Sequence, residues 1–106
     1  MQTYQHYING QFVDPKAGVW FESENPYNGE VWASIPRGDA DDVDLAVAAA
    51  KAAFDGEWGQ TGPTQRGKLL VKLAEIVERE AVRLGEIEVR DNGKLIAEMG
   101  AQTKYL

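Results

Sequence analysis

Few residues in this chain could do chemistry, and cysteine is not among them. The 106 residues contain no cysteine and a single histidine, His6. Without a thiol, the sequence excludes disulfides, thiolate metal ligands and a cysteine nucleophile. Because His6 stands near the N-terminus with no group of carboxylates beside it in the sequence, we interpret it as an exposed or edge-strand side chain. A metal ligand or a catalytic base is the less favoured interpretation.

An acidic cluster and a glycine-rich segment are the two other candidates. Asp39, Asp41, Asp42 and Asp44 are dense enough to suggest calcium, but they lack the central Gly and terminal Glu of a calcium loop. Helix capping explains them better. Residues 62–68 match G-x-x-x-x-G-K, yet no Ser or Thr follows and no buried strand precedes, so a phosphate-binding loop is not indicated. No G-x-G-x-x-G follows a strand either.

The composition predicts one globular domain. Hydrophobic residues make up 43%, charged residues 26%, and the net charge is -6. An acidic chain without a basic run is a poor partner for nucleic acid or an anionic membrane. The longest apolar run, Leu45–Ala50, is far too short to span a membrane, and no secretory signal is visible, so we expect a cytoplasmic protein.

Residues 1–38 read as strands and turns. Asn9-Gly10 stands between two short strand-like segments and predicts a type I′ hairpin over residues 7–13. Residues 19–23 and 31–35 are further strand candidates. They are separated by a turn at 25–30, where Gly29 can take the left-handed conformation.

Residues 39–106 read as helices. Asp39 can cap the first helix, Pro63 suits the first turn of the second, and Asn92-Gly93 is a good helix stop. A flexible connector is expected at 56–62 and a break near 80–85. Apolar residues at spacings of three and four predict two buried stripes: Val43, Ala46, Val47, Ala50 and Phe54 in the first helix, and Leu69, Leu70, Leu73, Ile76 and Val77 in the second.

A last helix is expected from Ile96 or Ala97, and its pattern still runs at Leu106. An uncapped helical pattern favours a cut polypeptide over a natural terminus, with fraying of a natural C-terminus as the alternative. The residues alone therefore predict an acidic domain with strands first and helices after, and no reaction.

Five segments resemble the aldehyde dehydrogenase family when taken in order. They are an opening hairpin at 7–13, an N-P-x-x-G-E turn within 24–31, a first long helix at 42–54, the segment 66–70, and a D-N-G-K motif within 88–94. The resemblance implies an α/β fold, of which this chain would be the start of the coenzyme-binding domain. It also implies oxidation of an aldehyde to an acid with NAD or NADP, in a homo-oligomer, by catalytic residues that all lie downstream of this segment.

The resemblance further implies two peripheral sites. Many members bind a monovalent cation through a backbone carbonyl before the N-P turn and the Asp of D-N-G-K, which places Ser23, Glu24 and Asp91 here. The alternative is that Asp91 only braces a helix end. Leu106 takes a position that borders the substrate tunnel, and Leu95 departs from the Pro that often follows Gly-Lys. A non-catalytic module derived from the family, and a fragment that self-associates through uncovered helix faces, remain alternatives.

Overall fold

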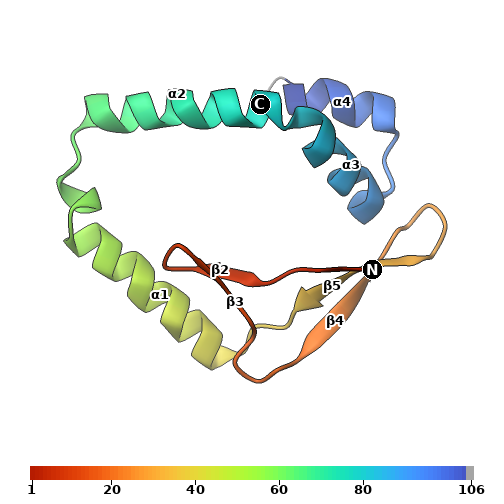
Figure 1. Ribbon diagram of the computed structural model, residues 1–106, viewed down its shortest axis with the longest axis horizontal. Coiled ribbons are helices and arrows are strands. Elements are labelled where there is room, and N and C mark those ends of the chain that lie inside the picture. Colours follow the sequence, from red (N-terminus) through yellow and green to blue (C-terminus); the bar gives the residue numbers. More distant parts are fainter. Residues whose placement is uncertain (105–106) are drawn as a thin grey trace. The chain divides into compact units, whose positions relative to one another are not determined.

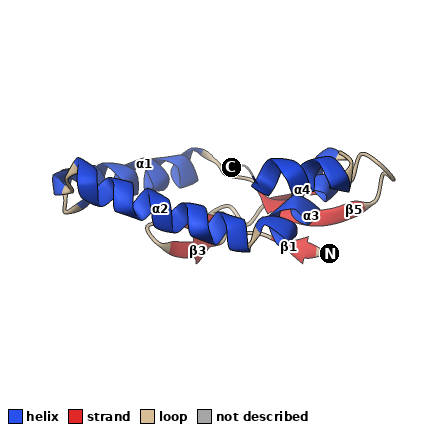
Figure 2. Ribbon diagram, turned by 90° about the horizontal axis from the view of Figure 1, so that it is seen from above, coloured by secondary structure: helices blue, strands red, loops and turns tan. Residues whose placement is uncertain are grey.

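Strands come first and helices follow in the computed structural model, which describes residues 1–104 (Figures 1 and 2). The chain divides into two compact units. The first, here the hairpin unit, comprises Met1–Ser23 and Trp32–Thr61. The second, here the helical unit, comprises Glu24–Val31 and the chain from Gly62 onward. Each unit thus combines residues from the strand-forming and helix-forming parts of the sequence.

The strands form two small sheets. Strands β1 (Gln2–Thr3), β5 (Val31–Pro36) and β4 (Trp20–Glu24) lie in that order in one sheet, with β1 parallel to β5. Strands β2 (His6–Ile8) and β3 (Gln11–Val13) form an antiparallel hairpin. Asn9 and Gly10 have φ values of 53° and 75°, which the type I′ turn requires. The predicted hairpin is therefore confirmed.

Helix α1 (Ala40–Asp55) begins with the predicted cap. The Asp39 carboxylate accepts a hydrogen bond from the Asp42 amide, and the Asp42 carboxylate accepts one from the Asp39 amide, so the two residues form a capping box. The connector predicted after α1 includes a short regular element. It contains a single 3-10 turn, η1 (Trp58–Gln60), closed by a hydrogen bond from the Thr61 amide to the Trp58 carbonyl.

Asp42 also ties α1 to the strand region of the hairpin unit. Its side chain accepts hydrogen bonds from the backbone amides of Lys16, at 3.0 Å, and Asp39, at 3.1 Å. The residue is only 5% exposed. These two amides, Asp39 first, hold the pKa of Asp42 below its ordinary value, because they stabilise the carboxylate over the neutral acid. One buried carboxylate therefore fixes both the start of α1 and the loop at Lys16.

The helical unit holds α2 (Pro63–Arg79), α3 (Ala81–Asn92) and α4 (Ile96–Lys104). Pro63 occupies the first turn as predicted. The break before α3 is shorter than the predicted 80–85, because only Glu80 leaves the helical conformation and Gly85 lies buried within α3. Gly93 ends α3 with φ 73° and donates to the Val89 carbonyl at 2.9 Å, which confirms the predicted stop.

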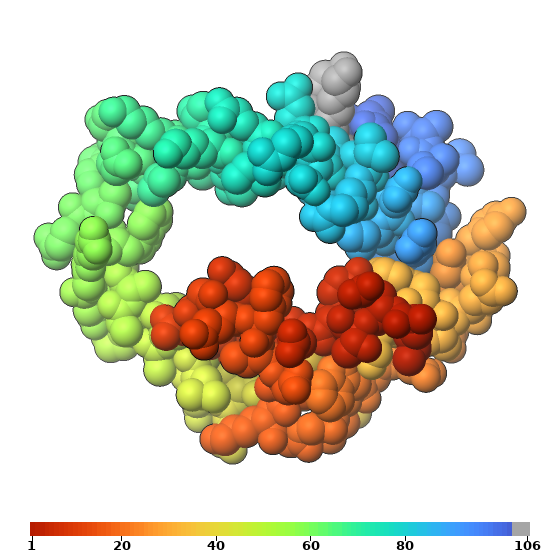
Figure 3. All heavy atoms as spheres, viewed as in Figure 1, coloured from red at the N-terminus to blue at the C-terminus, as the bar shows by residue number. Residues whose placement is uncertain are grey.

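The apolar stripes of α1 and α2 are not buried, contrary to the sequence prediction. Ala33 and Met99 are the only buried hydrophobic residues among those the structure describes. Val47 and Phe54 on α1 are 60% and 72% exposed, and Leu70 on α2, the green to cyan helix of Figure 3, is 65% exposed. The periodicity was sufficient to predict the helices. It could not predict burial, because burial needs an apolar surface opposite the stripe.

The end of α3 packs against the turn at 25–30 within the helical unit. A Cβ atom added to Gly93 would lie 3.2 Å from Pro26 Cβ and 3.4 Å from the Tyr27 amide nitrogen. Gly93 therefore satisfies two requirements at once: a left-handed backbone and space for the neighbouring Pro26 ring.

The Asp42 contacts predict an acid-sensitive hairpin unit. Because the folded-state pKa of Asp42 is depressed, its contribution is fully present above the unfolded value of about 3.9 and is lost as pH falls through the folded value. Asp42→Asn should lower the thermal midpoint at neutral pH, and its difference from the unmodified chain should shrink in acid. Circular dichroism melts across pH measure this. Asp44→Asn, an exposed change on the same helix, is the control; an equal loss from both variants at neutral pH would contradict the assignment.

At two glycines of the helical unit, we expect an added methyl group to change the stability in opposite directions. Gly93→Ala should destabilise the unit by about 1–2 kcal/mol, because the left-handed backbone disfavours a Cβ and Pro26 crowds it. Gly67→Ala, inside α2 with open space around its Cβ, should stabilise by about 1 kcal/mol. Urea unfolding followed by far-ultraviolet circular dichroism measures both changes. Two shifts of the same sign would show that one of these local arguments is incorrect.

Candidate functional site

The residues predicted to bind a cation lie at the ends of two elements. Ser23 and Glu24 are the last residues of β4, with Ser23 half-buried and Glu24 exposed. Asp91 is exposed in the last turn of α3. Glu24 and Asp91 belong to the helical unit and Ser23 to the hairpin unit. The shared cation site stays a prediction, and the predicted tunnel residue Leu106 lies outside the described residues.

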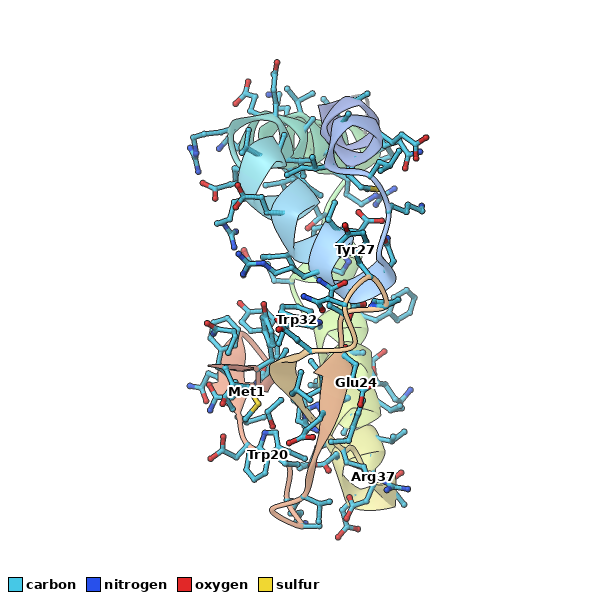
Figure 4. All side chains as sticks on the ribbon, turned by 90° about the vertical axis from the view of Figure 1, so that its right-hand side faces the viewer. Met1, Trp20, Glu24, Tyr27, Trp32 and Arg37 are labelled. Carbon is cyan, nitrogen blue, oxygen red and sulfur yellow. The ribbon has the colours of Figure 1, made fainter. Side chains whose placement is uncertain are left out.

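A hydrogen-bonded turn follows Glu24 directly. The Asn25 amide donates to the Glu30 carbonyl at 2.9 Å, and the Asn25 side-chain oxygen accepts from the Tyr27 amide at 2.9 Å. Gly29, with φ 70°, donates to the Asn25 carbonyl at 2.8 Å. Figure 4 labels Glu24 on β4 and Tyr27 within the turn. These bonds fix the backbone that immediately follows Glu24.

The position of Asp91 is electrostatically unusual. The last carbonyls of a helix carry partial negative charge, which favours Lys or Arg and disfavours a carboxylate. The same end is braced by polar contacts: Asn92 Nδ2 donates to Glu88 Oε1 at 3.4 Å, and the Lys94 amide donates to Asn92 Oδ1 at 2.9 Å. A carboxylate at such a helix end provides a hard oxygen ligand of the kind that alkali and alkaline-earth cations prefer.

Other metal chemistry finds no support within residues 1–104. No group of three or more His, Cys, Asp or Glu side chains in that range could hold a metal ion. Asp39 and Asp42 cap α1, as predicted, rather than forming a calcium loop. Residues 63–68 of the segment resembling a phosphate loop form the first turns of α2, where Pro63 has no N–H and the Arg66 amide donates to the Gly62 carbonyl, so the segment is helical and not a loop.

His6 has a carboxylate partner that the sequence analysis missed. Its Nε2 atom lies 3.9 Å from Asp42 Oδ2, and its side chain is 21% exposed. That distance is too long for a hydrogen bond, so the pair is a weak electrostatic contact in the hairpin unit. The two residues are 36 positions apart, and only the fold of the hairpin onto α1 brings them together; no local pattern could have indicated it.

An open groove of the hairpin unit lies between the β2–β3 hairpin and α1. Ile8, Val13, Leu45 and Ala49 make its apolar wall, and Asp42 and Lys16 are at its polar end. The residues that line the groove include no hydroxyl or thiol nucleophile beside a base.

In the helical unit, the Arg83 guanidinium 2.8 Å from Glu80 lowers the pKa of that carboxyl, with a smaller contribution from Arg79. This is an ordinary ion pair on a helix surface.

None of the described helices is both long and apolar enough to cross a membrane. The connection from β5 into α1 contains a single glycine, Gly38, and not the G-x-G-x-x-G with which dinucleotide-binding folds approach the pyrophosphate.

Comparisons with known proteins agree on the family and on how much of each relative this chain matches. The family model for the aldehyde dehydrogenase family matches residues 12–106. A curated relative, (Z)-2-((N-methylformamido)methylene)-5-hydroxybutyrolactone dehydrogenase of Acinetobacter baylyi, is 48% identical over the whole of this chain and 22% of its own length. The crystal structure of an NAD-dependent aldehyde dehydrogenase from Sinorhizobium meliloti has a TM-score of 0.94 and 34% identity, over 98% of this chain and 21% of that chain.

A second solved structure agrees. Betaine aldehyde dehydrogenase from Staphylococcus aureus, solved in complex with NAD+, has a TM-score of 0.90 and 31% identity, over 97% of this chain and 21% of that chain. The chain thus spans about a fifth of the length of these relatives. Because the family model covers nearly every residue and the predicted hairpin, turn and helix motifs all occur in the structure, the chain belongs to the aldehyde dehydrogenase family.

Proposed function

We propose that this chain forms the N-terminal part of an oxidoreductase that converts an aldehyde to a carboxylic acid with NAD(P)+. The observation that carries the proposal is the family match over residues 12–106, together with the order of the matching motifs. In this proposal the chain supplies scaffold to the coenzyme-binding domain, and the reacting groups belong to other parts of the enzyme.

The composition supports the scaffold role. Aldehyde oxidation in this family requires a thiolate to attack the carbonyl carbon, and the 106 residues contain no cysteine. An aldehyde is therefore proposed as the substrate of the whole enzyme and not as a ligand of this chain. The alternative is a non-catalytic structural or interaction module derived from the family.

The cation site is proposed at Ser23, Glu24 and Asp91. It is supported by the fixed backbone that follows Glu24 and by the carboxylate at the disfavoured end of α3. The competing structural role, in which Asp91 only braces the end of α3, is the simpler explanation. The two roles differ in one respect, because only the first makes stability depend on the identity of the cation.

The uncovered helix faces support assembly. Val47 and Phe54 on α1 and Leu70 and Leu73 on α2 are each more than half exposed, and exposed apolar stripes of this kind normally pack against other protein. We propose that the whole enzyme covers these faces as a cytoplasmic homo-oligomer, and that the 106-residue chain by itself self-associates through them.

The isolated chain is predicted to show no turnover. Purified 106-residue protein, mixed with NAD+ or NADP+ and a panel of aliphatic and aromatic aldehydes, should give no reduced cofactor by absorbance, because it has no thiolate. Cofactor reduction proportional to protein concentration would reject the scaffold proposal. The mass of the native polypeptide separates the alternatives: a product extending into dehydrogenase sequence supports the enzyme, whereas one ending at residue 106 supports the module.

The cation proposal predicts an ion-specific stabilisation. At constant ionic strength, replacing choline chloride with sodium or potassium chloride should raise the thermal midpoint, and Asp91→Asn should abolish the rise, because binding only to the folded state stabilises it. Asp44→Asn, on α1, is the charge-matched control and should retain the effect. An identical midpoint in all three salts would leave Asp91 with the bracing role alone.

A further inference from the structure

Asparagine is followed by glycine at three of its four positions in this chain. The pairs are Asn9-Gly10, Asn28-Gly29 and Asn92-Gly93, while Asn25 precedes Pro26. In an Asn-Gly pair the glycine amide nitrogen can reach the asparagine side-chain carbonyl, since no Cβ obstructs the approach. Asn25 cannot react in this way, because proline has no N–H. The sequence alone does not rank the three pairs, but their contacts do.

In the Asn28-Gly29 pair, hydrogen bonds hold both the Asn28 side chain and the Gly29 amide. Its Nδ2 donates to Glu30 Oε2 at 3.0 Å, and its Oδ1 accepts from the Glu30 amide at 3.0 Å. The Gly29 amide donates to the Asn25 carbonyl at 2.8 Å. Cyclisation would break all three hydrogen bonds and open the turn, so the folded structure opposes it.

Asn92 is held in a similar way. Its Oδ1 accepts from the Lys94 amide at 2.9 Å, and its Nδ2 donates to Glu88 Oε1 at 3.4 Å. The Gly93 amide donates to the Val89 carbonyl at 2.9 Å and closes the end of α3. Reaction here would require the last turn of the helix and its packing against Pro26 to separate.

Asn9 differs from both. Asn9 and Gly10 are exposed at the tip of the hairpin, and within residues 1–104 neither the Asn9 side chain nor the Gly10 amide makes a hydrogen bond. The flanking strands β2 and β3 have only three residues each. The type I′ turn must relax before the amide can attack, and local opening of so short an exposed hairpin needs little free energy.

We propose that Asn9 is the chain's principal site of spontaneous deamidation, with water as the only co-reactant. The Gly10 nitrogen forms a bond to Asn9 Cγ, and the Cγ–Nδ2 bond breaks. The proton lost by the Gly10 amide leaves with Nδ2 as ammonia, and a five-membered succinimide remains. Water then opens one of the two imide C–N bonds and gives aspartate or isoaspartate. No atom is oxidised or reduced.

The two products affect the hairpin differently. Aspartate keeps the α-linked backbone, and Asp-Gly is a good type I′ pair, so the register of Ile8 with Gln11 survives. Isoaspartate carries the main chain through Cγ and lengthens the turn by one carbon, which disrupts the pairing. Both products add one negative charge to the -6 of the chain, beside the groove that Asn9 lines together with Asp14 and Asp42.

Peptide mapping with mass spectrometry tests the proposal. The folded 106-residue chain is incubated at mildly alkaline pH, where amide deprotonation speeds cyclisation, and the acid and amide forms of the three Asn-Gly peptides are quantified over time. Deamidation at Asn9 should be several-fold faster than at Asn28 and Asn92. Fragmentation by electron transfer, or methylation by an isoaspartyl methyltransferase, should detect isoaspartate at position 9.

A parallel incubation in concentrated urea provides the control, because the three pairs should then react at similar rates once their hydrogen bonds are lost. Asn9→Gln should remove the early product without changing the rates at the other two sites. Comparable rates at all three sites in the folded chain, or an earlier product at Asn28 or Asn92, would overturn the proposal. So would an Asn9 preference that persists in urea, since it would not arise from the fold.

Discussion

Apolar side chains stabilise a fold only where another surface removes them from water. Within this chain, few apolar side chains are covered in that way. Among the described residues only Ala33 and Met99 are fully buried hydrophobic side chains. What defines the elements is largely local: the Asp39–Asp42 capping box, the Asn9-Gly10 turn, and the left-handed Gly93. Each of these satisfies backbone groups or dihedral requirements within a few residues and needs no core.

That division explains which parts of the fold could be predicted from sequence. The hairpin, the start of α1, Pro63 at the start of α2 and the end of α3 were predictable, because the residues that determine them lie next to the feature. The 3-10 turn at Trp58–Gln60 and the continuation of α3 through Gly85 could not be predicted, because glycine-rich or mixed segments can adopt several local conformations. The predicted burial of the helix stripes was wrong, because periodicity identifies the apolar face of a helix but not the surface that would cover it.

The candidate site could be predicted from local sequence even less well than the fold. Physical reading of the residues gave no function; the residues Ser23, Glu24 and Asp91 came only from resemblance to a family. No local signal indicates that Gly93 packs on Pro26 across 67 positions, or that His6 approaches Asp42 across 36. Two weak local motifs, an N-P turn and a D-N-G-K helix end, become one structural feature only when the helical unit folds.

The size of the uncovered surface bears on the choice between enzyme segment and independent module. Fully burying one large aliphatic side chain stabilises a fold by about 1.5–3 kcal/mol. Leu69, Leu70, Leu73 and Ile76 on α2 are 40–65% exposed. Covering them would add several kcal/mol, a substantial share of the roughly 5–15 kcal/mol that separates a folded domain from its unfolded chain. An independent module would have to obtain that cover from a second copy or a partner. In a dehydrogenase five times as long, the rest of the polypeptide can supply it, because the relatives have about four-fifths of their length outside the region matched here. The exposed stripe on α2 therefore supports the proposal that this face packs against further protein.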